Sequence, residues 1–567
     1  MKTLIFIFLL IVSANLFAQN ANQSLPYAEV IRKYKTLDSL SEEAKLLTYE
    51  KTDCGVPLHL LVISKSRIFD PSRLHEMKKC ILFINNGIHP GEPDGIDASL
   101  QLANDLITKP LYSRMLENVV VCIIPVFNID GALERGCCSR VNQNGPEEYG
   151  FRGNAKNLDL NRDFIKVDAS NTHSLINILR KWNPDVFIDT HVSDGADYQY
   201  TMTLIPTQHN KLNAIQGDFM KKKLTPALFE KMKDRNDEMS PYVQTLDNKE
   251  IPDSGIVGFL ETPRYLCGYL SLFNTFSYIS ESHMLKPFDQ RLKSTINLLV
   301  SLVEVCDEQK EKIIELRNKA NETVTKEKNY FFNWTCDTSK KELIDFKGYG
   351  AAIKPSKVTG GNRLYYDHKQ PYNKKIPFYD EYYPKDSIRI PNYFFIPQAW
   401  EEIVHKLEKN GVNFIRIDRD SSTTITATYI TDFETVREPY EGHYLHYNVK
   451  TRTENQKIKM KKGDYLIPMP QKNMRYALET LIPRAVDSYF CWGFFDSFLQ
   501  QKEWFSSYVY EDVAADLLEK DNSLKKEFEK WKLINPNADD YSQLNFIYQH
   551  STAFEKTYRR YPIFSCY

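Results

Sequence analysis

Cys80-Ile-Leu-Phe-Ile84-Asn-Asn-Gly-Ile-His89-Pro-Gly-Glu92-Pro-Asp-Gly95 is the stretch from which the fold can be inferred. Its first five residues form an apolar run with the length of a buried strand, and a turn rich in Asn and Gly follows directly. In a tight turn at the carboxyl end of a strand, His89 and Glu92 can converge on one point outside the sheet. An imidazole nitrogen and a carboxylate are two of the three protein ligands that a catalytic Zn²⁺ keeps, with one position left open. The stretch therefore predicts a sheet that carries a metal site at one edge.

A third ligand should come from the end of another strand. Val186-Phe-Ile188 has the character of a second short buried strand, and His191 lies just past it. Asp189 is close enough in sequence to hold the imidazole of His191 from behind, as carboxylates do for metal-binding histidines. His191 is therefore the best candidate for the third ligand.

The segment Arg152-Gly-Asn-Ala-Lys-Asn-Leu-Asp-Leu-Asn161-Arg162-Asp163-Phe164, taken with the three ligand candidates, resembles the zinc metallocarboxypeptidases of the carboxypeptidase A type. The resemblance implies one Zn²⁺ per chain, held by His89, Glu92 and His191. It also implies that Asn161 hydrogen-bonds the terminal carboxylate of the substrate and that Arg162 polarises the scissile carbonyl.

Arg152 stands nine residues before Asn161. In the regulatory branch of the same family, an arginine at that offset clamps the terminal carboxylate. A planar guanidinium can donate two parallel hydrogen bonds to a carboxylate, so it is well suited to bind a free C-terminus. The resemblance therefore gives Arg152 and Asn161 the role of holding the substrate carboxylate.

Phe276-Ser-Tyr-Ile-Ser-Glu281-Ser-His283 resembles the family strand that carries the catalytic glutamate. Alternation along a strand turns Ser280 and Ser282 away from the side of Glu281, whereas His283 shares that side. A glutamate beside a metal site can take a proton from the attacking water and pass it to the leaving amine. We therefore expect Glu281 to be the general base and His283 to have a structural role.

The resemblance also implies a mobile tyrosine that caps the substrate, about twenty residues before the general base. Phe259 lies near that offset, while Tyr265 and Tyr269 are closer to Glu281. Tyr269, next to Gly268, is the preferred candidate.

Residues 25–310 alternate strand-like apolar runs, such as 119–125, with segments of helical spacing, such as 171–180. This pattern predicts an α/β sheet with the site at strand ends, and the resemblance implies a mixed eight-stranded sheet flanked by helices. Residues 292–324 have the character of one long helix. We therefore place a catalytic domain at 19–325.

Residues 326–567 are expected to form a β-rich α+β region with a helical tail. Residues 413–418 and 423–429 alternate as half-buried strands do, and 399–411 reads as an amphipathic helix stopped by Gly411. Eight aromatic residues crowd 489–505, where a core or an interface is the favoured interpretation. Without a second ligand set, this region is expected to serve stability or substrate access.

Residues 1–18, a basic start followed by a short apolar run and small residues, predict a signal peptide cleaved after Ala18. We therefore expect an exported bacterial member of the family, periplasmic or secreted, without membrane insertion. The net charge of −1 gives no argument for a nucleic-acid partner. Among the ten cysteines, the adjacent Cys137 and Cys138 and the near-terminal Cys566 are candidates for oxidation after export.

Three functions remain open from the sequence. The leading one is zinc-dependent hydrolysis of the C-terminal peptide bond of peptides. The second is a zinc amidase or deacylase that acts on N-acyl amino acids or peptidoglycan stem peptides, which also present a free carboxylate. The third is a non-catalytic peptide-binding module with a vestigial metal site, and the presence of Glu281 argues against it.

Overall fold

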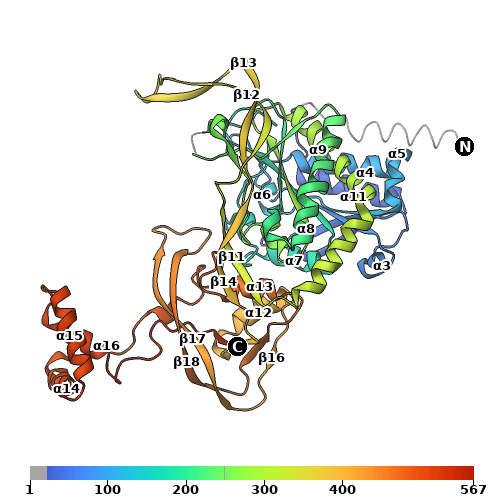
Figure 1. The fold of residues 1–567 in the computed structure, drawn as a ribbon. Helices are drawn as coiled ribbons and strands as arrows, with labels where there is room; N and C mark the ends of the chain where they lie inside the picture. The colour runs from blue at the N-terminus through green and yellow to red at the C-terminus, as the bar shows by residue number, and fades with distance from the viewer. Residues whose placement is uncertain (1–21, 248–249) are drawn as a thin grey trace, which may run out of the picture.

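The computed structural model describes residues 22–247 and 250–567, so the predicted signal peptide lies outside the described residues. Its first half is built on a mixed eight-stranded sheet with strand order β1-β2-β4-β3-β5-β10-β6-β7 (Figure 1). The strands are β1 (Ala44–Lys51), β2 (Pro57–Ile63), β3 (Cys80–Asn85), β4 (Val119–Ile124), β5 (Val186–Ser193), β6 (Met202–Pro206), β7 (Met239–Pro241) and β10 (Phe276–His283). The predicted fold class is confirmed.

Four neighbouring strands, β4, β3, β5 and β10, run parallel in the middle of the sheet. β1 and β2 are antiparallel to their neighbours, and β6 is antiparallel to β10 but parallel to β7, so the sheet is mixed. Because parallel strands end at the same edge, the residues that follow β3 and those near the ends of β5 and β10 meet there. This edge carries the candidate site.

β3 is buried along its whole length and contributes side chains to two hydrophobic cores. Ile81 and Phe83 point into one core, whereas Leu82 and Ile84 point into the other, as the period of two requires. One core lies under α7 (Ser170–Trp182) and α10 (Leu266–Ser271). The opposite core is covered by α2 (Tyr27–Leu40), α4 (Asp94–Thr108), α8 (Ala214–Phe219), α9 (Thr225–Asp234) and α11 (Phe288–Val324).

The turn after β3 leads straight into α4. Gly87 lies in the left-handed region with φ of +64°, and Gly95 opens the helix against β5. A Cβ at Gly95 would lie 1.8 Å from Thr190 Oγ1, so only glycine permits this approach. The glycines that mark the turn in the sequence therefore fix how closely α4 packs on the sheet.

α11 is a single helix of 37 residues, as the sequence predicted from residue 292 onward. It ends at Val324, next to the predicted domain boundary, and β11 (Asn329–Cys336) begins the second half. No helix in the described ranges combines the length and apolar character needed to cross a membrane.

The second half is rich in β-structure. β11 pairs with β14 (Tyr382–Arg389), and a six-stranded sheet has the order β16-β19-β15-β20-β17-β18. Its strands are β15 (Tyr393–Ile396), β16 (Ile415–Arg416), β17 (Ser421–Thr435), β18 (His446–Met460), β19 (Tyr465–Pro468) and β20 (Phe564–Cys566). The predicted strand at 423–429 is part of β17, whereas only two residues of the strand predicted at 413–418 are paired.

The two halves share one hydrophobic core. Leu175 and Leu266 of the first half belong to the same buried cluster as Tyr476 and Trp492 of the second. Most of the predicted aromatic group lies here, and Tyr489, Phe490 and Phe495 are fully buried, whereas Trp504 is exposed. The preference for a core or interface over a groove is therefore confirmed for its central members.

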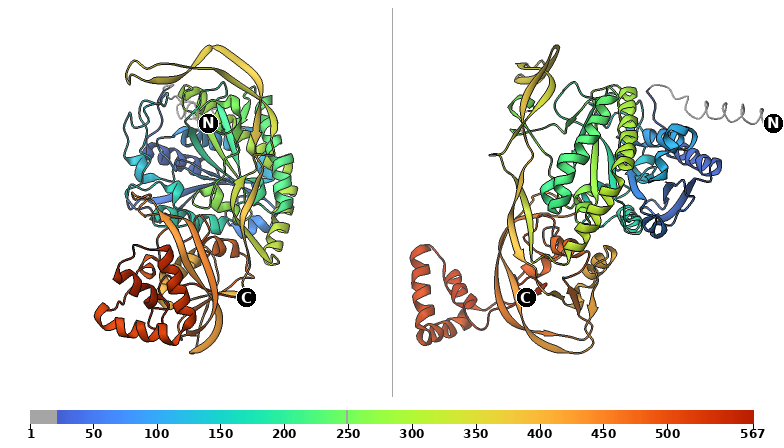
Figure 2. Two further views of the ribbon diagram at one scale, coloured as in Figure 1. Left: turned by 60° about the vertical axis from the view of Figure 1, so that its left-hand side comes forward. Right: turned by 45° about the vertical axis from the view of Figure 1, so that its right-hand side comes forward.

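A long hairpin also ties the halves together. β12 (Glu342–Pro355) and β13 (Asn362–Tyr379) pair with each other, and β13 joins β9 (Ile256–Val257) and β8 (Gln244–Thr245) of the first half in one sheet. The hairpin runs along the side of the first half and its end extends beyond it (Figure 2).

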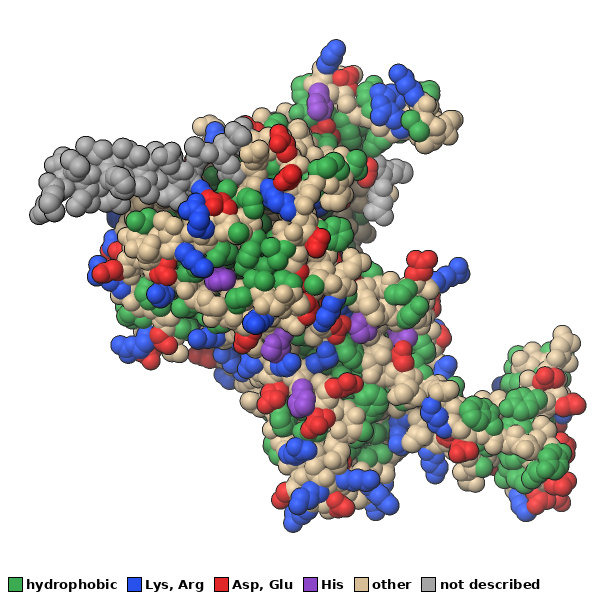
Figure 3. Space-filling model, turned by 180° about the vertical axis from the view of Figure 1, so that it is seen from behind, with side chains coloured by type: hydrophobic (Ala, Val, Ile, Leu, Met, Phe, Trp, Pro, Cys, Tyr) green, Lys and Arg blue, Asp and Glu red, His purple; other side chains and the backbone are tan. Residues whose placement is uncertain are grey.

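The remaining helices of the second half include α12 (Glu401–Lys409), which ends before Gly411 with φ of +75° as predicted, and α13 (Met474–Leu481). The helical tail consists of α14 (Ser507–Lys520), α15 (Asn522–Ile534) and α16 (Asp540–Gln549), which pack into a small core of their own. The tail stands away from the rest of the molecule (Figure 3). Cys137 and Cys138 form a disulfide, and Cys566 is a free thiol.

Candidate active site

The three predicted metal ligands meet at the edge of the sheet. One ligand atom each from His89, Glu92 and His191 lie within 4.8 Å of one another, and all three residues are buried. His89 Nδ1 lies 3.3 Å from Glu92 Oε1, and His191 Nδ1 lies 3.1 Å from Glu92 Oε2. His191 lies within β5, because this strand runs on to Ser193 and not only to the predicted Ile188.

Each imidazole is held from behind by a carboxylate. His191 Nε2 donates to Asp189 Oδ2 at 3.0 Å, as the sequence suggested, and His89 Nε2 donates to Asp159 Oδ1 at 2.9 Å. With the protons on Nε2, both Nδ1 atoms present lone pairs to the common point. Asp159 was missed in the sequence, although it lies inside the quoted segment that ends at Phe164.

Glu92 is anchored by groups that leave it ionised. Arg140 Nη1 donates to Glu92 Oε1 at 2.8 Å, and the backbone N–H of Val192 donates to Oε2 at 3.0 Å. Burial opposes ionisation, but Arg140 and His89 outweigh it and hold the pKa of Glu92 well below its usual range. Nothing in the sequence around Arg140 marked it as part of the site.

The geometry fits a zinc ion. His89 Nδ1 is buried and has no hydrogen-bond partner among the described residues, although it faces two other potential ligands. Two imidazoles and one carboxylate form a known catalytic zinc set, and the two carboxylates behind them supply the usual outer support. His89, Glu92 and His191 are thus suited to hold Zn²⁺.

Glu281 lies beside this triad. It is paired with His191 across β10 and β5, and the two side chains line one cleft of about 220 Å³. Burial raises the pKa of Glu281 to about 8, with Glu92 and Asp194 adding to the shift and His191 opposing it. A bound divalent cation would favour the carboxylate form of this group.

Arg152, Asn161 and Arg162 line the same cleft. Arg152 Nη1 lies 3.3 Å from Glu92 Oε1, and its Nε donates to Asp159 Oδ2 at 3.0 Å. Asn161 Oδ1 accepts from the backbone N–H of Leu266 at 3.0 Å, which orients its side chain. These three predicted residues are therefore brought together with the metal ligands.

The turn Tyr440–His443 of the second half supports residues of the site from outside the cleft. Arg162 Nε donates to the hydroxyl of Tyr440 at 3.1 Å, and Glu441 Oε2 accepts from the backbone N–H of Asp159 at 2.7 Å. His443 Nε2 donates to Asp168 Oδ2 at 2.7 Å and fastens the far side of the turn. The turn thus supports both a substrate-pocket arginine and the residue behind His89.

The structure does not bring Tyr269 to the cleft. α10 turns this side chain into the core, where it is 1% exposed and its hydroxyl donates to Asn410 Oδ1 at 2.8 Å. Tyr265, at the start of the helix, lines the cleft instead, and the guanidinium of Arg162 stacks 4.2 Å from its ring centre. Tyr269 therefore cannot cap a substrate in the cleft, and this prediction is wrong.

His283 takes the structural role expected of it. Its ring stacks on Tyr198 with 4.1 Å between the ring centres, and its Nε2 lies 3.3 Å from Asp197 Oδ1. No contact joins His283 to the metal ligands in the described part of the chain.

A mixed sheet with two histidines and a glutamate at its edge, next to a buried glutamate and three arginines, defines a zinc-dependent hydrolase. Comparison with known proteins agrees. Residues 34–214 match the model of the zinc carboxypeptidase family.

Two relatives are named carboxypeptidases. The chain is 22% identical over 496 residues to carboxypeptidase 2 of Trichophyton tonsurans, which covers 80% of this chain and 81% of that protein. It is 32% identical over 165 residues to carboxypeptidase SOL1 of Arabidopsis thaliana, covering 26% of this chain and 29% of the relative. The crystal structure of carboxypeptidase A from Helicoverpa armigera aligns at 15% identity over 56% of this chain and 81% of that one. The TM-score of this alignment is 0.39.

Residues 34–214 are thus similar to the zinc metallocarboxypeptidases of the M14 peptidase family, and the triad of His89, Glu92 and His191 lies within this stretch.

Proposed function

We propose that this enzyme hydrolyses the C-terminal peptide bond of peptides that end in a free carboxylate, with Glu281 as the general base. The observation that carries the proposal is the single cleft that holds the triad, Glu281 and both arginines. When bound there, Zn²⁺ lowers the pKa of a coordinated water and polarises a carbonyl. Glu281 accepts the proton of the attacking water and delivers it to the leaving amine.

The two arginines exchange the roles that the sequence suggested. Arg152 lies against Glu92, which supports a role for its N–H groups in stabilising the negative charge that the scissile carbonyl oxygen gains. Arg162 stacks on Tyr265 and makes no contact with a metal ligand in the described ranges, which leaves it room to receive the terminal carboxylate. Asn161, adjacent to Arg162, supplies an amide N–H to the same carboxylate.

We also propose that the enzyme works after export, which rests on the signal-like sequence of residues 1–18.

The test uses residues 19–567 and pairs of peptides that differ only in a free or an amidated C-terminus. Free peptides should be shortened by one residue, chelation should abolish this activity, and Zn²⁺ should restore it. Amidation should lower kcat/KM by about 30-fold or more, because it removes one partner of a charge pair. Equal cleavage of both forms would contradict exopeptidase action, and cleavage of N-acyl amino acids alone would favour the deacylase.

A further inference from the structure

The free end of the β12–β13 hairpin, residues 350–366, is exposed to solvent and is called the hairpin end below. At its base, Tyr366 packs against a small core shared with the first half. Farther out, where the hairpin extends beyond the first half (Figure 2), Ile353 is 62% exposed. Val358, in the turn between the strands, is 92% exposed and is the most exposed large apolar side chain in the described ranges. Apolar side chains left this exposed on a projecting ribbon indicate an interaction outside the chain.

The register of the two strands divides the side chains of the hairpin end between two faces. Lys354 pairs with Arg363, and the next pair is Ile353 with Leu364. Opposite residues of an antiparallel pair share one face and successive residues alternate, so one face is cationic and the other is apolar. Lys354 Nζ lies 4.0 Å from the ring centre of Tyr365, which belongs to the cationic face. The hairpin end is therefore amphipathic.

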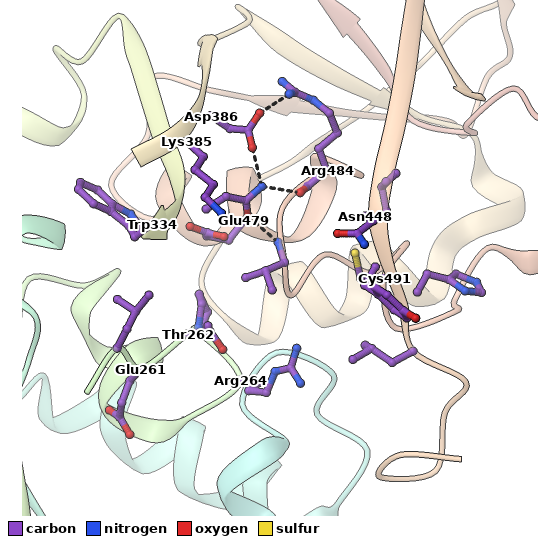
Figure 4. Close-up of a pocket in the computed structure, with 18 of the residues that line it drawn as sticks. Glu261, Thr262, Arg264, Trp334, Lys385, Asp386, Asn448, Glu479, Arg484 and Cys491 are labelled. Carbon is purple, nitrogen blue, oxygen red and sulfur yellow. Dashed lines mark hydrogen bonds and ion pairs between the residues drawn. The ribbon is translucent and has the colours of Figure 1, made fainter. Parts of the chain in front are cut away.

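The charges of the hairpin end have one sign. Its charged residues are Lys354, Lys357 and Arg363, and the sequence from 350 to 366 contains no aspartate or glutamate. No carboxylate in the described part of the chain forms an ion pair with these three cations. By contrast, Figure 4 shows Arg484 paired with Asp386 in a cavity of about 430 Å³ between the two halves. The cations of the hairpin end are thus available to an anionic partner.

An anionic lipid surface fits this combination. Cations that meet lipid phosphates and apolar side chains that enter the headgroup layer strengthen binding to a bilayer together. A soluble polyanion would use the cations but would leave Ile353 and Val358 in water. A second copy of the chain, paired edge to edge, would bring the like charges of two hairpin ends together, which opposes such pairing.

The helical tail also projects and exposes apolar side chains, but it does not fit the same surface. Leu533 is 82% exposed there. Residues 507–549 contain nine acidic and five cationic residues, so an anionic bilayer would repel the tail. The tail therefore offers lysines for a control.

We propose that the hairpin end binds the surface of an anionic phospholipid bilayer. Lys354, Lys357 and Arg363 lie against the lipid phosphates, and Val358 enters the headgroup layer. This contact holds the enzyme at a membrane that no part of the hairpin crosses. The hairpin end contains none of the residues that line the cleft, so the proposal does not rest on the proposed function.

The test measures co-sedimentation of residues 19–567 with phospholipid vesicles. Vesicles of phosphatidylglycerol and phosphatidylethanolamine should bind the protein, vesicles of phosphatidylcholine should not, and salt should weaken binding. Each Lys or Arg near an anionic bilayer strengthens binding by about fivefold. The triple variant Lys354→Gln, Lys357→Gln and Arg363→Gln should therefore bind the anionic vesicles about 100-fold more weakly.

The matched control replaces Lys525, Lys526 and Lys530, three exposed lysines of α15, by glutamine. It makes the same change in net charge and should keep vesicle binding within about threefold. Val358→Ser tests the apolar contribution and should weaken binding to anionic vesicles by about fivefold. All three variants should keep the Tm of the unaltered protein, because none of these side chains is buried.

Equal binding to both kinds of vesicle, or anionic binding that survives in the triple variant, would overturn the proposal. Binding to long-chain polyphosphate without binding to vesicles would also overturn it and would assign the hairpin end to a soluble polyanion. A dimer that forms without lipid and is lost in the triple variant, measured by sedimentation velocity, would assign it to a second copy of the chain instead.

Discussion

Replacing Asp159 by asparagine should weaken zinc binding without touching a zinc ligand. Asp159 Oδ1 accepts from His89 Nε2 at 2.9 Å and from the backbone N–H of Asn161 at 2.8 Å, while Oδ2 accepts from Arg152 Nε at 3.0 Å. Burial alone would raise the pKa of Asp159, but His89 and Arg152 hold it far below its usual range. An asparagine has one acceptor atom for these donors, so its amide N–H₂ must face either His89 or Arg152.

The size of the effect follows from that mismatch. Loss of a carboxylate behind a zinc-binding histidine costs about 10- to 100-fold in metal affinity, or about 1.4–2.8 kcal/mol. If the amide oxygen faces His89, the amide N–H₂ displaces Arg152 and kcat falls as well. Zinc affinity therefore reports on the contact with His89, and kcat reports on the contact with Arg152. Neither result requires global unfolding.

Zinc affinity is measured by competition with a chelator of known affinity, and kcat is measured with saturating zinc. Asp386→Asn is the control, because Asp386 pairs with Arg484 in the second half, away from the triad. The reasoning would be refuted if Asp159→Asn bound zinc as tightly as the unaltered protein and kept its kcat.

Three further outcomes are expected. Glu281→Gln should retain zinc by metal analysis while kcat falls about 10²- to 10⁴-fold, and full activity would move the general base elsewhere. A chain that ends at residue 325 should be poorly soluble, because it exposes the core shared by both halves; a soluble, monomeric and fully active product would contradict this. Burial raises the pKa of Glu479 to about 7 from 4.5, so its stabilising contribution is complete below pH 4.5 and lost as the pH rises through 7. As the pH rises from 5 to 8, the free energy of unfolding of Glu479→Gln should therefore rise relative to that of the unaltered protein by on the order of 3 kcal/mol, measured by denaturant unfolding. The same difference in free energy between the two proteins at pH 5 and at pH 8 would count against this.

The parts of the site that lie close together in the chain were predictable. His89 and Glu92 share one turn after β3, and Asp189 and His191 share one face of β5, so local geometry alone brings each pair together. The eight-stranded sheet was likewise implied by the resemblance that these motifs carry. Gly95 was part of the quoted stretch, but only the structure shows that it approaches Thr190 too closely for any other residue.

The parts that depend on long-range packing were not predictable. Arg140 reaches Glu92 across 48 residues, and Glu441 reaches Asp159 across 282, without a motif at either end. Tyr269 and Tyr265 are four residues apart and chemically identical. Only the start of α10 decides that the first is buried and the second lines the cleft.

The turn Tyr440–His443 has a consequence for how the enzyme comes into being. All metal ligands and Glu281 have been synthesised once α11 ends at Val324, but the supports for Arg162 and Asp159 come from Tyr440 and Glu441. The chain has 567 residues, so a nascent chain that has only reached α11 contains the ligand residues and Glu281 but lacks the turn that supports Arg162 and Asp159. The order of translation itself therefore delays the completed peptidase until the second half has been made and has docked.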